Sequence, residues 1–342
     1  MHSLAVHDLV SDTLRGRDTA EGRRSTAFAA PLDVWRRVLA FEGCAVQFER
    51  ALQRAGVMRE APVHLRRFLL DETGASLRHA VLVHEQLAAI GALAARHGIR
   101  VLVLKGAARL LAAGLGGTRS IADIDLLVSP REATHLHRLL QVEQGYAVAG
   151  AAQSHHLAPL VRSRCLSVEI HLRLTDDELP LDAAIWRDTR QARAGAVALE
   201  IPSPTSMLLH TLEHATTLNW MSRYRLRDIL DVAGCFTAEV SSSHLDAYVR
   251  RSPRRSALEM ILSAAHDVEP RIPQWRPNAW RTIRRISRAR IAVAAASGNR
   301  VIAERIFRYV GVLAEGSPRT VSRAGLTAAR WVRAASAALM GA

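Results

Sequence analysis

Residues 99–128 read IRVLVLKGAARLLAAGLGGTRSIADIDLLV, and this stretch contains the pattern of a small α/β unit. The continuous apolar run at 101–104 predicts a buried strand. Residues 107–113 then predict a helix that ends at Gly114, and residues 121–128 predict a second strand. The stretch therefore indicates a strand, a helix and a second strand, which is a small α/β unit.

The second predicted strand places two carboxylates on one face. Side chains alternate across a strand, so Asp123 and Asp125 point to one side while the apolar residues between them point to the core. Like charges this close repel each other unless a cation lies between them. The same alternation in the predicted strand 166–172 puts Glu169 and His171 on one face. If the two strands are neighbours, three carboxylates converge, and such hard oxygen ligands suit Mg²⁺.

Basic residues flank this strand pair. Lys105-Gly106 lies where the first strand turns into the helix, and backbone N–H groups at such a turn bind phosphate. Lys105 is the only lysine in a chain with 46 lysine and arginine residues, which suggests that arginine cannot replace it there. Arg119 could bind a phosphate with both of its terminal nitrogens. The alternative is an ordinary turn with a surface lysine and a surface arginine.

The rest of the chain is organised around this unit. Polar residues 1–30 predict a mobile tail, and residues 31–98 predict a helical flank. The catalytic core is expected at 99–178, with a helix from 130 to about 144 and further short strands before the one at 166–172. Residues 179–342 predict a helical domain. The expected fold class is α+β, a small mixed sheet with a largely helical N-terminal flank and a helical C-terminal domain.

Composition limits the classes of function. The formal charge is +14, which favours either a nucleic-acid partner or arginine-rich codon usage, and both readings stay open. Three widely separated cysteines, Cys44, Cys165 and Cys235, suggest a reducing compartment without disulfides. No apolar run is long enough for a bilayer and no secretion signal is visible, so we expect a cytoplasmic protein without a membrane partner.

Histidines provide competing candidates. His210-Thr211-Leu212-Glu213-His214 matches an inverted zinc-protease motif, which would need a third ligand such as Glu259. A helix with buried or surface histidines explains the same pattern more simply. His155-His156 precedes a predicted strand and fits a plain loop or a contact with an acceptor. His171 fits either a phosphate contact or a histidine at the edge of the core.

The order strand, Lys105-Gly106, helix, Arg119-x-x-x-Asp123-x-Asp125, helix and a later strand with Glu169 resembles the nucleotidyltransferase superfamily, which includes polymerase-beta-like enzymes. The segments "VLVLKGAARLL", "TRSIADIDLLVSP" and "VEIHLRL" resemble, over residues 99–175, a bacterial nucleotidyltransferase family whose first motif is Lys-Gly. The superfamily more often has Gly-Ser or Gly-Gly at the first motif and aspartate at the third carboxylate.

The resemblance implies a catalytic set of Asp123, Asp125 and Glu169, which hold Mg²⁺ or Mn²⁺. It also implies nucleotide contacts, for which the candidates are Lys105, Gly106, Arg119 and His171. The expected reaction moves a nucleotidyl group from a nucleoside triphosphate to an acceptor hydroxyl or phosphate and releases pyrophosphate. The acceptor could be a small molecule, a peptide or an RNA. The alternatives are another phosphate-bearing donor, such as a nucleotide-sugar, and a non-catalytic module that binds nucleic acid or a protein partner.

Overall fold

The computed structural model describes residues 2–17, 21–114, 121–153, 155–174, 180–216, 225–252 and 254–275. The chain divides into two compact units. We call the first the helical unit; it comprises Met1–Leu70, Ala215–Gly234 and Tyr248–Ala342. We call the second the sheet unit; it comprises Asp71–His214 and Cys235–Ala247. In the described part of the chain, no helix has the length and the apolar character that crossing a bilayer requires.

The helical unit is built from short helices around an aromatic cluster. Trp35 stacks on Phe48 with ring centroids 5.7 Å apart, and Phe28 lies at 6.2 Å from Trp35. The elements that begin or lie in this unit are α1 (His2–Leu14), α2 (Glu21–Phe28), α3 (Leu32–Glu42), α4 (Ala45–Arg54), the 3₁₀-helix η1 (Met58–Glu60), the start of α5 (Val63–Arg96), α11 (Leu226–Cys235) and α13 (Arg255–His266).

The first thirty residues differ from the prediction. We expected a mobile tail at 1–30, but residues 2–14 and 21–28 form α1 and α2. Val6, Leu9 and Val10 are buried there, because their three-and-four spacing places them on one helix face. The polar residues around them hid this short apolar stripe, so composition alone suggested disorder.

The sheet unit contains a mixed sheet with strand order β3-β4-β5-β2-β1-β7-β6. The strands are β1 (Val101–Val103), β2 (Asp123–Val128), β3 (Ala147–Val148), β4 (Leu160–Val161), β5 (Ser167–His171), β6 (Thr189–Ala194) and β7 (Val197–Pro202). The helices are α6 (Lys105–Ala113), α7 (Pro130–Gln144), α8 (Pro180–Ala184), α9 (Pro204–Thr216) and α12 (Ser242–Arg251), which continues into the helical unit. A mixed sheet with this many helices confirms the α+β fold class.

Two strands at the centre of the sheet determine the geometry that follows. β2 pairs with β5 in parallel, with Asp123 opposite Ser167 and Asp125 opposite Glu169. β1 pairs with β2 in the antiparallel direction, with Val101 opposite Val128 and Val103 opposite Leu126. Ile124, Leu126, Val168 and Ile170 are fully buried on the face opposite to Asp125 and Glu169. The alternation of apolar and polar residues therefore fixes this register.

The hairpin β6–β7 was not predicted. We expected only helices after residue 179, but residues 189–202 form two antiparallel strands, and β7 pairs in parallel with β1. This hairpin extends the sheet beyond the segment 99–178. The sequence of β6 is TRQARA, whose polar residues resemble an exposed helix as much as an edge strand.

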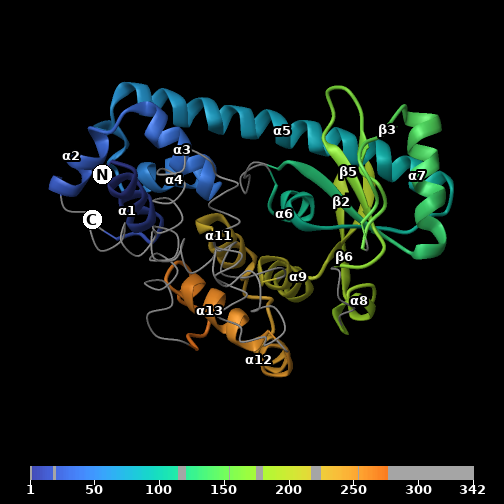
Figure 1. The fold of residues 1–342 in the computed structure, drawn as a ribbon. Coiled ribbons are helices and arrows are strands. Elements are labelled where there is room, and N and C mark those ends of the chain that lie inside the picture. The colour runs from blue at the N-terminus through green and yellow to red at the C-terminus, as the bar shows by residue number, and fades with distance from the viewer. Residues whose placement is uncertain are drawn as a thin grey trace, which may run out of the picture. The chain divides into compact units, whose positions relative to one another are not determined.

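The C-terminal part of α5 lies along the sheet (Figure 1). Gln86 joins them, because its side-chain amide donates to the Leu166 carbonyl and to the Tyr146 hydroxyl, both at 2.8 Å. One turn further on, Gly91 lies against the hairpin; a Cβ there would be 2.6 Å from Leu199 Cδ2 and 2.9 Å from Val197 Cγ1. A Cβ at this position would force Leu199 or Val197 to shift, so glycine permits this close approach of helix and sheet.

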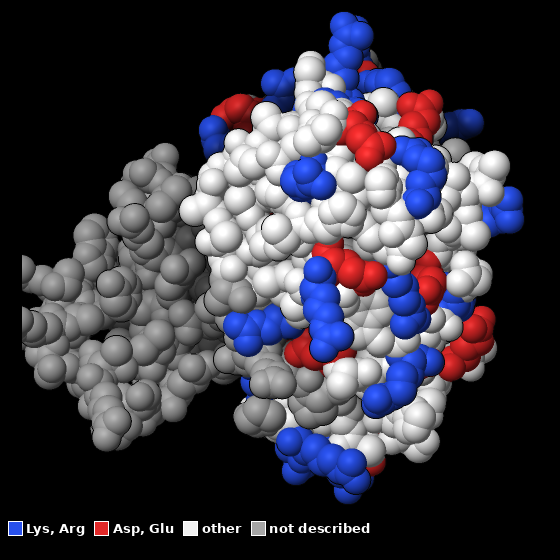
Figure 2. All heavy atoms as spheres, turned by 90° about the vertical axis from the view of Figure 1, so that its right-hand side faces the viewer, with Lys and Arg blue, Asp and Glu red and all other residues white. Residues whose placement is uncertain are grey.

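Charged side chains are mixed on the surface. Figure 2 shows one face of the molecule, on which basic and acidic residues lie interspersed among neutral ones. On the described part of this face, the excess of arginine does not form a continuous basic surface. The net charge of the chain alone therefore gives no argument for a nucleic-acid groove here.

Candidate metal centre

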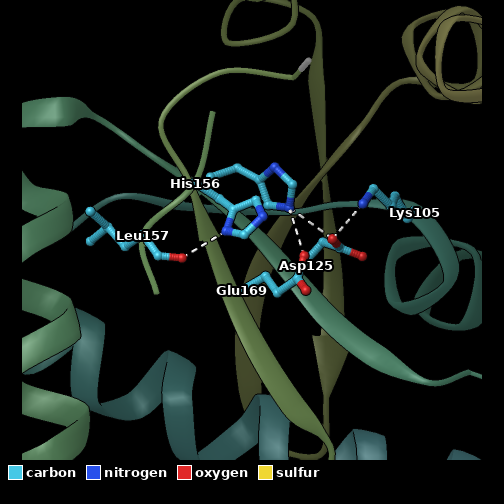
Figure 3. Close-up of polar contacts among 6 residues, drawn as sticks. Lys105, Asp125, His156, Leu157 and Glu169 are labelled. Carbon is cyan, nitrogen blue, oxygen red and sulfur yellow. Dashed lines mark hydrogen bonds and ion pairs between the residues drawn. The ribbon is translucent and has the colours of Figure 1, made fainter. Parts of the chain in front are cut away.

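The centre lies where β2 and β5 run side by side (Figure 3). Asp125 Oδ1 lies 2.8 Å from His171 Nε2 and 2.6 Å from Lys105 Nζ. Glu169 Oε2 lies 3.6 Å from the same His171 nitrogen. Lys105 thus approaches from α6, Asp125 from β2, and Glu169 and His171 from β5. These contacts place both carboxylates, the imidazole and the ammonium on one face of the sheet.

Lys105 has an unusual backbone. Its φ is 48°, one of two positive values among the described non-glycine residues. This left-handed conformation at the first residue of α6 costs about 1–2 kcal/mol for a residue with a Cβ. The preceding Leu104 N–H donates to the Asp125 carbonyl at 2.9 Å, so the backbone of β2 holds the turn at this point. The strained residue is therefore the one whose side chain contacts Asp125. Backbone strain of this kind is typical of functional positions.

Asp125 is a buried carboxylate that stays ionised. Only 2% of its side chain is exposed, and burial alone would raise its pKa. The positive charge of Lys105 and the hydrogen bond from His171 outweigh burial, and the pKa of Asp125 falls well below its usual range. Asp125 is therefore an anion at neutral pH.

The partners of Asp125 respond to the same charges. The hydrogen bond from His171 lowers the pKa of Glu169. Burial would lower the pKa of His171, but the hydrogen bonds to Asp125 and Glu169 raise it on balance. Without a further cation, Lys105 and His171 are thus the groups that balance the two carboxylates.

The donor set fits a divalent cation. Asp125, Glu169 and His171 each offer a ligand atom, and these atoms lie within 4.8 Å of one another. Ligands that bind one ion at about 2.0–2.6 Å lie within about 4–5 Å of one another. Among the described residues, this is the group whose ligand atoms lie close enough to share one ion. Asp123 does not belong to it.

The remaining residues predicted for the site have different positions. Asp123 is the first residue of β2 and is partly exposed. Gly106 is buried in the first turn of α6. Arg119 lies outside the described residues. The structure thus brings together Lys105, Asp125, Glu169 and His171, while Asp123 stands two residues before Asp125 on the same strand.

Two other histidines surround His171. The rings of His155 and His156 each lie with their centroids 5.4 Å from the His171 ring. The backbone of this segment pairs with the end of β5, because Leu157 N–H donates to the Ile170 carbonyl and Leu172 N–H to the His155 carbonyl. His156 is only 3% exposed, and its Nδ1 lies 2.7 Å from the Leu157 carbonyl oxygen. We treated His155-His156 as a loop or an acceptor contact, and the signal of a packed histidine cluster was not visible in the sequence.

His210 on α9 is a further buried group of the sheet unit. Its Nε2 has no hydrogen-bond partner among the described residues. Burial, followed by the charges of Lys105 and His171, lowers its pKa to about 3, so the imidazole is neutral. His210 and His214 belong to no group of described residues whose ligand atoms could share an ion. The inverted zinc-protease pattern therefore has no metal geometry in the described part of the chain.

The chain is similar to one described protein family and to a solved structure. No curated protein matches the chain. A crystal structure of an antigenic nucleotidyltransferase-like protein from Paracoccidioides brasiliensis matches at 16% identity, over 52% of this chain and 92% of that chain, with a TM-score of 0.33. The model of a family described as uncharacterised nucleotidyltransferase matches residues 37–270, which is well over half of the chain. The protein therefore belongs to this family of uncharacterised nucleotidyltransferases.

Proposed function

We propose that this protein is a metal-dependent nucleotidyltransferase that moves a nucleotidyl group from a nucleoside triphosphate to an acceptor hydroxyl or phosphate. The observation that carries the proposal is the pairing of Asp125 with Glu169 on adjacent parallel strands, beside Lys105 at the start of α6. Two ionised carboxylates and a nearby ammonium match the needs of phosphoryl chemistry, in which a cation and a basic side chain neutralise developing negative charge.

The roles of the residues follow from their positions. Asp125 and Glu169 would hold the ion, and Asp123 would contribute from the exposed start of β2. The bound ion would supply positive charge for the donor phosphates and the departing pyrophosphate. Lys105 would exchange its bond with Asp125 for a contact with these phosphates, together with the backbone of Gly106. Arg119, which follows α6 in the chain, remains a candidate for a further phosphate contact.

Glu169 is placed to receive a proton. Its side chain is 23% exposed and its pKa is lowered, so it is an accessible base at neutral pH. The acceptor oxygen would lose its proton to Glu169 while it attacks the α-phosphorus. A new oxygen–phosphorus bond would form, the bond to the bridging oxygen would break, and pyrophosphate would leave with that electron pair.

The experiment is a pyrophosphate-release assay with each of the four nucleoside triphosphates, Mg²⁺ or Mn²⁺, and pools of small molecules, peptides and RNA as acceptors. We expect release that requires the ion and falls at least about a hundredfold in Asp125→Asn and in Glu169→Gln, because each variant removes an ionised ligand. Asp123→Asn should also weaken metal-dependent binding of the triphosphate. The matched control is Glu200→Gln, which removes a carboxylate of β7 that pairs with Arg100 instead. Triphosphate binding that is equal in wild type, in these variants and in chelator would rule the proposal out.

A further inference from the structure

The ligand atoms of the centre are not all oxygens. His171 Nε2 lies between the two carboxylates, 2.8 Å from Asp125 and 3.6 Å from Glu169. Its side chain is 1% exposed, so the imidazole has no route to bulk water as an alternative partner. The ligand atoms of such a site also lie close together in the absence of the ion, because a proton shared between them then takes the place of the ion. The contact geometry of His171 is that of a third ligand.

Asp123 does not take this third position. It is partly exposed at the start of β2, and its ligand atoms lie outside the group formed by Asp125, Glu169 and His171. Two carboxylates and one imidazole are therefore the donors that the described residues bring within reach of one ion.

The ring of His171 is held in place by its neighbours. His155 and His156 pack on it, and the backbone of this segment bridges to His171 itself. Its Nδ1 has no hydrogen-bond partner among the described residues, so packing and the Nε2 contacts set its orientation. A ring that is fixed with Nε2 toward two carboxylates needs little rearrangement to bind an ion.

The chemistry of the donors selects the class of ion. Mg²⁺ prefers oxygen ligands in octahedral geometry, whereas imidazole suits first-row transition metals. We infer that His171 is a metal ligand through Nε2, and that the centre takes a first-row transition-metal ion in preference to Mg²⁺, with Mn²⁺ as the paramagnetic probe of this class. Only the catalytic role of the ion rests on the proposed function. Binding of the ion to the centre can be measured without substrate.

The test uses the full chain loaded with Mn²⁺ in the absence of nucleotide. Pulsed electron paramagnetic resonance detects a nitrogen bound to Mn²⁺ through its ¹⁴N coupling. We expect this coupling in wild type, its replacement by ¹⁵N coupling in uniformly ¹⁵N-labelled protein, and its loss in His171→Gln. His97→Gln, which changes a partly exposed histidine of the C-terminal turn after α5, is the matched control and should keep the coupling. Calorimetry should give an affinity at least about tenfold higher for Mn²⁺ than for Mg²⁺.

The outcomes are separable. Bound Mn²⁺ without nitrogen coupling in wild type overturns the inference, whether or not the variant folds. Coupling that persists in His171→Gln overturns it as well. Metal-dependent pyrophosphate release without nitrogen coupling would leave the proposed function standing and remove His171 from the ligands. Nitrogen coupling without any nucleotidyl transfer would keep His171 among the ligands and contradict the proposed function.

Discussion

Replacing Lys105 separates its charge from its backbone conformation. Lys105→Ala removes a 2.6 Å charge-assisted hydrogen bond to a carboxylate whose side chain is 2% exposed. Such bonds contribute about 1.5–3 kcal/mol. Complete isolation of a buried charge costs about 3–5 kcal/mol, but Asp125 keeps its bond from His171. We therefore expect the free energy of unfolding to fall by about 1.5–3 kcal/mol.

Lys105→Gly removes the same bond but also relieves the backbone. A φ of 48° costs a residue with a Cβ about 1–2 kcal/mol, and glycine adopts it freely. Glycine loses about 0.5–1 kcal/mol through the greater entropy of its unfolded chain. The glycine variant should thus be more stable than the alanine variant by up to about 1.5 kcal/mol.

Urea denaturation of the wild type and both variants measures these differences. Lys105→Ala with wild-type stability would refute the ion-pair argument, and a glycine variant less stable than the alanine variant would refute the strain argument. Under the proposed function, triphosphate affinity should fall about tenfold in both variants, since a contact of about 1.4 kcal/mol corresponds to that factor. Affinity for the metal alone should not fall, because Lys105 competes with the ion for Asp125.

Two further predictions concern α5 and α9. Gly91→Ala should lose about 1–3 kcal/mol through overpacking against Leu199 and Val197, whereas Gly74→Ala in the same helix meets only Arg78 at 3.4 Å and should gain about 0.5–1 kcal/mol; denaturation midpoints that move together in both variants would contradict the close approach of α5 and β7. In the folded protein His210 stays neutral until the pH falls to its pKa of about 3. In the unfolded chain the same imidazole becomes protonated below about pH 6.5. Wild-type stability should therefore fall as pH decreases through this window, by up to about 1.4 kcal/mol per pH unit from this group. His210→Leu should flatten that slope, and parallel pH profiles of the two proteins would show that the imidazole titrates normally.

The periodic part of the fold was predictable from the sequence. The apolar run of β1, the alternation in β2 and β5, and the Ser129-Pro130 start of α7 each carry a local signal that the structure retains. The long helix α5 lies within the helical flank predicted at 31–98. Along its C-terminal part Val83, Leu87 and Ile90 are buried, whereas Leu77 and Val81 are exposed.

Part of the candidate site could also be predicted from the sequence. Strand parity predicts that Asp125 and Glu169 share a face, and parity depends only on local residues. The paired residues of the two strands are 44 positions apart in the sequence, and register over such a separation is a non-local property. The sequence therefore did not distinguish Asp123 from Asp125 as the partner of Glu169. The histidine packing and the bond between Lys105 and Asp125 depend on tertiary contacts, which no motif encodes.

The register of β2 and β5 has a consequence for tolerated sequence change. The buried residues Ile124 and Val168 are opposite one another, and so are Asp125 and Glu169. A single-residue insertion or deletion within β5 would turn Glu169 toward the core and bring an apolar side chain to Asp125. The same event would place a carboxylate among buried apolar residues, so the fold would fail together with the chemistry. Substitutions can accumulate along these two strands, but length changes in them are excluded by the packing that aligns the carboxylates.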